Sequence, residues 1–187
     1  MNCLAIDTTN TKLTVVVIKG GDTFCREMEV GKSGHSRLLM PTVDETLKDS
    51  GLSVDDIDVV AAVVGPGSFT GIRIGVSAMT AIAFANKSKR IAVTSFELIA
   101  YNCAKVLAAV DAGHGNAYCA ECEDGEVKNA YFTSDGLPEE AKTLPNCELS
   151  QALAGVVRKK AERGEFVDVL APYYMRKSQA EREKDEI

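Results

Sequence analysis

Histidine is scarce in this chain of 187 residues, which contains only two, His35 and His114. Two imidazoles are too few for most histidine-rich metal sites. Lysine and arginine are also outnumbered, 21 against 27 acidic residues, and the net charge is −6. Domains that bind nucleic acid directly usually carry a stripe of lysine and arginine side chains on their surface. The charge balance therefore argues against direct nucleic-acid binding, although not against a role beside a nucleic-acid binder.

Long apolar runs are missing as well, and none approaches the length of a transmembrane helix. The N-terminus enters Cys3-Leu4-Ala5-Ile6 without the basic lead or the cleavage site of a signal peptide. We therefore expect a cytoplasmic protein without membrane contact. In that reducing compartment, most of the six cysteines should be small buried hydrophobes rather than disulfides. The one CxxC, Cys119 to Cys122, falls in an expected strand, whose alternation points the two side chains to opposite faces, the wrong geometry for one metal.

Common catalytic motifs are absent, because the chain has neither the Gly-Lys-Ser/Thr of a P-loop nor a serine in a nucleophile elbow. A glycine-rich turn is present at Gly65-Pro66-Gly67, after an unbroken apolar run at 59–64 that is typical of a central parallel strand. Ser68 or Thr70 can cap the helix that follows. The free amides at the start of that helix could hold an anion. The glycine spacing, one residue longer than the dinucleotide fingerprint, instead favours close packing of the helix.

Hydrophobic periodicity predicts an alternation of strands and helices along the chain. Pro41 lies inside the first helical pattern and should kink that helix or mark a late start. Thr94 and Glu97 have the spacing of a capping box. The expected strands cover residues 3–6, 13–18, 23–30, 59–64, 91–93, 106–110, 117–122, 127–133 and 166–171, and the expected helices 36–50, 71–85, 94–103 and 149–163.

The layout of residues 3–30 recurs at 106–133: a strand, an aspartate, a polar loop, a strand, an acidic-glycine turn and a strand. Two copies of one unit predict two related subdomains. Asp7 and Asp111 follow the first strand of each copy, where two carboxylates could hold Mg²⁺ beside phosphates. Alternatively, each aspartate accepts amide hydrogen bonds from its own turn. The second interpretation is favoured, because no glycine follows Asp7 closely and no basic residue follows Asp111 closely.

The run Val64-Gly65-Pro66-Gly67-Ser68-Phe69-Thr70-Gly71-Ile72-Arg73-Ile74-Gly75 resembles the signature of the TsaB (YeaZ) family. The resemblance continues in Leu4-Ala5-Ile6-Asp7-Thr8-Thr9, in His35-Ser36-Arg37-Leu38-Leu39-Met40-Pro41, in Asp111-Ala112 and in Pro172-Tyr173-Tyr174-Met175-Arg176. It implies an α/β fold of the actin, hexokinase and Hsp70-like (ASKHA) superfamily with two ribonuclease H-like subdomains. Residues 1–102 would form the first, with the partner-binding helices, and 103–187 a shortened second, whose tail returns to the first.

The same resemblance implies a non-catalytic scaffold in tRNA processing. Members pair with the catalytic subunit TsaD, and with the ATPase TsaE, to place a threonylcarbamoyl group on the tRNA adenosine next to the anticodon (t6A). The tRNA would be contacted mainly through the partner, and the chain alone would form a homodimer. TsaD holds its metal through a histidine motif on the first helix, whereas His35 stands alone here. The resemblance thus implies no metal and no tightly bound cofactor, with ATP or ADP at the partner interface as the nucleotide to test.

Two sets of residues are candidates for these roles. The small-residue stripe of the 71–85 helix is expected to let a partner helix approach, so Gly75→Leu should weaken binding and leave the monomer folded. The expected partner interface comprises His35, Leu38, Leu39, Thr42, Gly71, Gly75, Ala78 and Ile82. The expected degenerate nucleotide site comprises Asp7, Thr8, Thr9 and Asp111.

The chain departs from the family pattern in two places. Where the family has Ala-Arg-Arg-Gly-Glu, this chain has Ala112-Gly113-His114-Gly115-Asn116. No arginine is therefore present at this place to contact an anion. The stretch between Thr133 and Phe166 is also short for the family. Two alternatives remain: an enzyme of the same superfamily, either a nucleotide-dependent phosphotransferase or a peptidase, and a free-standing regulatory homodimer.

Overall fold

A five-stranded sheet forms the centre of the computed structural model, which describes residues 1–31 and 34–176. Its strand order is β3-β2-β1-β4-β5, with β1, β2 and β3 antiparallel and β1, β4 and β5 parallel. The strands are β1 (Asn2–Asp7), β2 (Lys12–Lys19), β3 (Asp22–Glu29), β4 (Val59–Gly65) and β5 (Lys89–Thr94). All seven residues of β4 are buried. The prediction of a central parallel strand is therefore confirmed.

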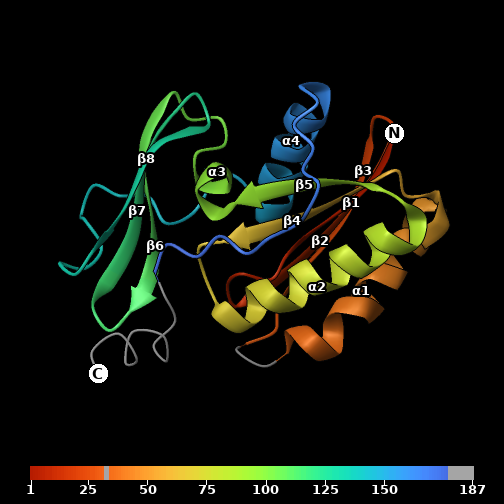
Figure 1. Cartoon of the computed structure of the whole chain (residues 1–187), viewed down its shortest axis with the longest axis horizontal. Helices are drawn as coiled ribbons and strands as arrows, with labels where there is room; N and C mark the ends of the chain where they lie inside the picture. The colour runs from red at the N-terminus through yellow and green to blue at the C-terminus, as the bar shows by residue number, and fades with distance from the viewer. Residues whose placement is uncertain (32–33, 177–187) are drawn as a thin grey trace.

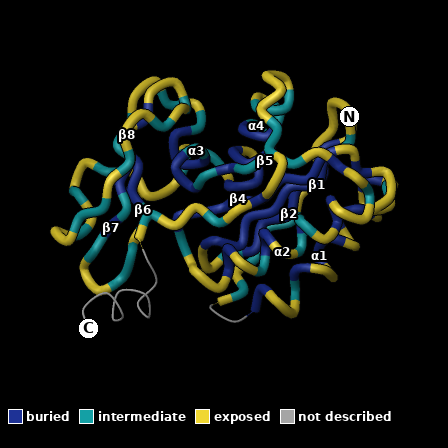
Figure 2. The backbone as a smooth tube through the Cα atoms, viewed as in Figure 1, coloured by how far each residue is buried: buried dark blue, intermediate teal, exposed yellow. Residues whose placement is uncertain are grey.

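Helices cover both faces of this sheet (Figure 1). Helices α1 (His35–Ser50) and α2 (Phe69–Asn86) lie side by side on one face and pack on alternate sheet residues such as Leu4 and Ile6. Helix α4 (Leu149–Glu162) packs on the other face, against Cys3 and Ala5. Between β3 and β4, a 3₁₀ turn, η1, spans Val54–Asp56. Strands β1, β2 and β4 of the large sheet form the most continuous buried region among the described residues (Figure 2).

A smaller sheet lies beside the first and consists of β6 (Lys105–Gly113), β7 (Asn116–Glu123) and β8 (Glu126–Thr133), all antiparallel. The short helix α3 (Ser95–Ile99) packs against it through Phe96, Ile99 and Ala100. The predicted repeat is confirmed for its three antiparallel strands. In the described residues, however, the second unit has no counterpart of β4, β5 or the helices on the large sheet, which agrees with a shortened second subdomain.

Four sequence-based boundaries differ from the structure. Helix α3 ends at Ile99 rather than near residue 103, and residues 166–171 form a single bridge, Val167 to Arg90, rather than a strand. Pro41 lies in the interior of α1, which begins at His35, so it marks no late start. Residues 149–163 were expected to belong to the second subdomain, yet α4 packs on the first sheet. The chain therefore returns to the first subdomain earlier than we expected.

The described tail crosses from one unit to the other. Leu170 is buried in the cluster under α1 and α2, and the Tyr173 amide donates to the Val64 carbonyl oxygen at 2.8 Å. Met175 then packs in the cluster between α3 and the small sheet. The described part of the tail therefore contacts both units.

All six cysteines are free thiols, but only Cys3, Cys119 and Cys122 are buried, so the expectation that most are buried was too broad. Cys119 and Cys122 belong to different apolar clusters, as strand alternation predicts. In the described part of the chain, no helix is long and apolar enough to cross a membrane.

Candidate functional site

The turn between β1 and β2 packs tightly against the start of α2. The Ser68 amide donates to the Thr9 carbonyl oxygen at 2.6 Å, and the Thr8 hydroxyl donates to the Gly71 carbonyl oxygen at 2.8 Å. A Cβ atom at Gly67 would lie 2.5 Å from the Thr9 carbonyl oxygen, and one at Gly71 would overlap the Thr8 carbonyl oxygen. The glycines are therefore required by backbone packing within the chain, which confirms the packing interpretation.

Two amides at the start of α2 already have acceptors. Ser68 is the N-cap, and its hydroxyl oxygen accepts from the Gly71 amide at 3.2 Å. The Ser68 amide is directed to Thr9. A helix start binds an anion when its amides point at an open space. At α2 the backbone of the β1–β2 turn occupies that position, so these two donors are unavailable to a phosphate.

A cavity of about 820 Å³ separates the β1–β2 turn and the start of α2 from the far end of β6. Asp7, Thr9 and Asp111 all line it, as the predicted nucleotide site requires. Thr8 does not line it, because its side chain is buried against Gly71. The wall also contains three residues that were not predicted to line it, His35, Leu98 and Ile99. The topology thus brings three of the four predicted residues to one cleft.

The carboxylate of Asp7 is buried and hydrogen-bonded within its own turn. It accepts from the Thr9 amide at 2.8 Å, from the Thr9 hydroxyl at 2.7 Å and from the Asn10 side-chain amide at 3.1 Å. Burial raises the pKa of Asp7 above its usual value, against the opposing effects of the Thr9 and Asn10 hydrogen bonds and of nearby His35. Asp111 is exposed and accepts from the Gly113 amide at 2.7 Å. Both aspartates therefore act as turn-stabilising residues, the interpretation that the sequence favoured.

The charged side chains on the cleft wall are mostly acidic. Three carboxylates line it, those of Asp7, Glu29 and Asp111, against the single ammonium of Lys12. The Nε2 atom of His35 lies 3.1 Å from the Lys12 carbonyl oxygen, so this ring nitrogen is engaged within the chain. Within residues 1–31 and 34–176, no three acidic, histidine or cysteine side chains gather as a metal site would require. Binding of a nucleotide at the interface with a partner is a separate prediction, which these residues do not test.

The raised pKa of Asp7 has a consequence for stability. A carboxyl whose pKa is higher in the folded state gives most stability below its unfolded pKa of about 3.9, and loses it as pH rises through the folded value. We expect the free energy of unfolding of Asp7→Asn, relative to the unsubstituted chain, to increase as pH rises from about 4 toward neutral. Urea unfolding across this pH range measures it. A pH-independent difference for Asp7→Asn would contradict the assignment.

The residues predicted to contact a partner lie mostly inside the chain. His35, Leu39, Thr42, Gly71, Gly75 and Ile82 are buried, and Leu38 and Ala78 are half-buried. A Cβ at Gly75 would overlap the Thr8 hydroxyl, so the small-residue stripe fits α2 to the β1–β2 turn rather than to a partner helix. The expectation that Gly75→Leu leaves the monomer folded is therefore wrong. Binding of a partner by α1 and α2 remains a prediction. It would depend on side chains of these helices other than the buried ones named above.

The side chains of these helices that point away from the sheet form a surface that the sequence-based argument missed. On α2 this surface has one charged residue, Arg73, and it includes Phe84, whose side chain is 82% exposed. Met40 on α1 is 49% exposed. The signal was available in the sequence, because α2 has only Arg73 as a charged residue in 18 positions. We call one part of this surface the outer face. It leaves aside the exposed charged residues in the C-terminal half of α1, Asp44, Glu45, Lys48 and Asp49, and comprises Arg37, Met40, Pro41, Arg73, Ser77, Ala81 and Phe84.

Comparisons with known proteins agree with this fold. The family model described as TsaD, tRNA N6-adenosine threonylcarbamoyltransferase, matches residues 29–146. The Escherichia coli protein "tRNA threonylcarbamoyladenosine biosynthesis protein TsaB" is 34% identical over 132 residues, which are 67% of this chain and 57% of that protein. The Haemophilus influenzae protein of the same description is 28% identical over 139 residues, 70% of this chain and 58% of that protein. The chain thus spans little more than half the length of these curated relatives.

The solved structures give the same result for the fold. "YeaZ from Pseudomonas aeruginosa" has a TM-score of 0.77 at 24% identity, covering 92% of this chain and 99% of that one. A second structure, of an uncharacterized protein with similarity to peptidase YeaZ from Pseudomonas aeruginosa, has a TM-score of 0.77 at 25% identity. Together with the family model and the curated relatives, these similarities show that the chain belongs to the TsaB (YeaZ) family, within the TsaD-like domain family.

Proposed function

We propose that this chain is a non-catalytic subunit for threonylcarbamoylation of the tRNA adenosine next to the anticodon. It would pair with a TsaD-like catalytic subunit and act with a TsaE-like ATPase in the cytoplasm. The printed descriptions of the Escherichia coli and Haemophilus influenzae relatives, both tRNA threonylcarbamoyladenosine biosynthesis proteins, support this role. The tRNA itself would be bound mainly by the partner, in line with the net charge of −6.

The observation that carries the proposal is the outer face of α2. A helix that packs one side on a sheet normally presents charged and polar side chains on its other side. Here that side presents Phe84 and the small residues Ser77 and Ala81, with Arg73 as its one charge. Exposed phenylalanine with small neighbours favours helix-on-helix docking, because the small residues let the axes approach. A TsaD-like helix pair is the occupant we propose, and a second copy of the chain would occupy this face when the partner is absent.

The cleft supports a non-catalytic role. The Asp7 carboxylate accepts three hydrogen bonds from its own turn, and the Thr9 carbonyl oxygen accepts from the Ser68 amide at the start of α2. A general base or a metal ligand needs a lone pair that is directed at the reacting atoms. At Asp7 the oxygen atoms are directed at Thr9 and Asn10 instead.

The proposal is tested by reconstitution with TsaD-like and TsaE-like proteins from the same organism. The mixture receives tRNA, ATP and threonylcarbamoyl-adenylate, and transfer to tRNA is measured with and without this chain. We expect transfer to require the chain, and the chain alone to turn over neither ATP nor peptides. Transfer that is unchanged without the chain would overturn the proposal. Nucleotide hydrolysis by the chain alone would instead support a phosphotransferase-like enzyme that uses the 820 Å³ cleft.

A further inference from the structure

Two exposed aromatic rings lie together at the start of α2. Phe69 is the first residue of α2 and Tyr174 belongs to the described tail, and the two are 43% and 44% exposed. Their ring centroids are 5.3 Å apart and their planes differ by 28°, so the rings are stacked. The hydrogen bond from the Tyr173 amide to the Val64 carbonyl oxygen holds the tail backbone next to this pair. The stack is therefore formed within the chain, although both side chains are exposed.

The side chain of Arg73 lies against this stack. Its guanidinium carbon is 3.9 Å from the centroid of the Phe69 ring and 5.9 Å from that of the Tyr174 ring. Its Nε donates to the Tyr174 hydroxyl oxygen at 2.8 Å. A guanidinium that is stacked and bonded through Nε is restricted in orientation, so it loses little conformational freedom when its two Nη groups bind a ligand. Arg73 is therefore a pre-oriented cation on the outer face.

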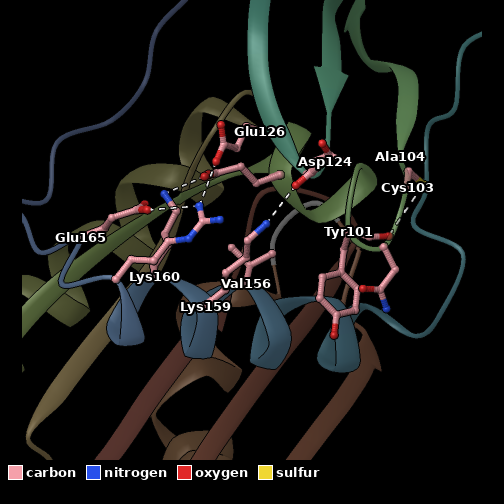
Figure 3. Close-up of a pocket in the computed structure, with 13 residues that line it drawn as sticks. Tyr101, Cys103, Ala104, Asp124, Glu126, Val156, Lys159, Lys160 and Glu165 are labelled. Atoms are coloured by element: carbon pink, nitrogen blue, oxygen red, sulfur yellow. Dashed lines mark hydrogen bonds and ion pairs between the residues drawn. The ribbon is translucent and has the colours of Figure 1, made fainter.

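The Nη groups of Arg73 have no acceptor of their own. Within the part of the chain that the structure describes, neither group forms a hydrogen bond or an ion pair. Arg163 provides the contrast. In a hollow of about 480 Å³ between α4 and the β7–β8 turn, its guanidinium pairs with Glu126 at 2.9 Å and with Glu165 at 3.5 Å (Figure 3). The charge of Arg163 is thus neutralised within the chain, whereas that of Arg73 is left to the solvent.

Arg73 also lies among exposed side chains that favour docking. Phe69 lies one turn before it on the same side of α2, and Phe84 follows on that side three turns later. A partner that covers this side of α2 removes the water around Arg73. A charge that loses its water without gaining an ionic partner strongly opposes association. The partner must therefore bring an anionic group to this position.

We infer that Arg73 is a specificity-determining residue of the outer face and that it binds a carboxylate side chain of the partner. The inference rests on the proposed function, because it names the chemistry of the protein that docks there. A carboxylate can accept two parallel N–H···O bonds from one guanidinium. A tRNA phosphate could accept the same bonds, but the aromatic surroundings and the net charge of −6 favour a protein. A protein without aspartate or glutamate at this position would be rejected, because Arg73 would be buried unpaired.

Affinity for the TsaD-like subunit tests the inference. The subunit is immobilised for surface plasmon resonance, and the chain is diluted until it is monomeric. We expect Arg73→Ala to weaken binding by at least about tenfold, with an unchanged circular dichroism spectrum. Arg73→Lys keeps the charge but not the planar guanidinium, so it should remain several-fold weaker than the unsubstituted chain. Arg37→Ala is the matched control, because Arg37 is an exposed arginine of the outer face that no described ring or hydroxyl orients. It should weaken binding by less than about threefold.

The salt dependence of binding separates charge recognition from a purely structural role. Arg73→Ala should reduce the loss of affinity that added salt causes, because one intermolecular ion pair is missing. Tyr174→Phe keeps the stacked ring and removes the hydroxyl that accepts from Arg73. It should weaken binding a few-fold and leave the salt dependence unchanged. If Arg73 only held the tail against α2, Arg73→Ala would leave the salt dependence unchanged as well.

Phe84→Asp, measured in parallel, distinguishes failure of this inference from failure of the proposed function. A loss of affinity for Phe84→Asp but not for Arg73→Ala would retain the outer face and overturn the role of Arg73. Unchanged affinity for both would overturn both. Equal losses for Arg73→Ala and Arg37→Ala would contradict a role for the aromatic stack. Weaker binding of tRNA to the assembled complex, with unchanged affinity for the subunit, would assign Arg73 to a phosphate and also overturn the inference.

Discussion

Gly71→Ala is expected to lower the free energy of unfolding by about 3 kcal/mol, because its methyl group would overlap the Thr8 carbonyl oxygen. Neither side can yield easily. The Thr8 hydroxyl is bonded to the Gly71 carbonyl oxygen, and the adjoining Thr9 carbonyl oxygen accepts from the Ser68 amide. The clash therefore forces α2 away from β1, where both contribute to the same apolar cluster. Urea unfolding followed by circular dichroism measures the loss.

Gly21→Ala is the matched control for this substitution. A Cβ atom at Gly21 meets nothing within 4 Å, and the backbone there is not left-handed. We expect its free energy of unfolding to change by less than about 0.5 kcal/mol. If Gly71→Ala were as mild as Gly21→Ala, the contact between the β1–β2 turn and α2 would not be the reason for glycine at position 71.

Phe84→Asp is expected to weaken binding to a TsaD-like subunit strongly while leaving the chain folded. The Phe84 side chain is 82% exposed, so the substitution removes no packing within the chain. In a complex, the same position would be desolvated, and an unpaired carboxylate there is costly. An anchoring aromatic residue at an interface is typically worth about 2 kcal/mol or more, which corresponds to roughly a 30-fold loss of affinity. Titration calorimetry with the purified subunit measures this loss.

Leu144→Asp is the control for a charge placed on an exposed apolar side chain, since Leu144 is 65% exposed and lies on the connection that follows β8, away from α1 and α2. Its affinity for the subunit should equal that of the unsubstituted chain. Equal affinities of Phe84→Asp and the unsubstituted chain would show that the partner does not cover the outer face.

Most of the fold was predictable because its signals are local. The uninterrupted apolar run of β4 and the capping box at Thr94 and Glu97 each predicted an element that the structure contains. The end of α3 was not predictable in this way. Phe96, Ile99 and Ala100 pack against the small sheet, and the chain leaves the helix to reach β6, so tertiary packing rather than helix propensity determines where α3 stops.

The candidate site was predictable in part. Asp7 and Asp111 could be placed at one cleft, because each follows the first strand of a repeated unit. The interface residues were not predictable from periodicity alone. A stripe of glycines indicates close approach but not the identity of the neighbour, and at Gly71 and Gly75 that neighbour is Thr8 of the same chain. The sequence alone does not show which side of α2 faces the sheet. It therefore cannot tell whether a stripe of small residues is buried in the chain or exposed to a partner.

The most direct test of the account is threonylcarbamoyl transfer to tRNA with three forms of the chain in otherwise identical mixtures. The unsubstituted chain, Phe84→Asp and Leu144→Asp are each added to TsaD-like and TsaE-like proteins with tRNA, ATP and threonylcarbamoyl-adenylate. At chain concentrations that just saturate the unsubstituted complex, we expect the unsubstituted chain and Leu144→Asp to restore transfer equally, and Phe84→Asp to restore far less. Full transfer with Phe84→Asp, or transfer that needs no chain at all, would contradict a scaffold that acts through the outer face of α1 and α2.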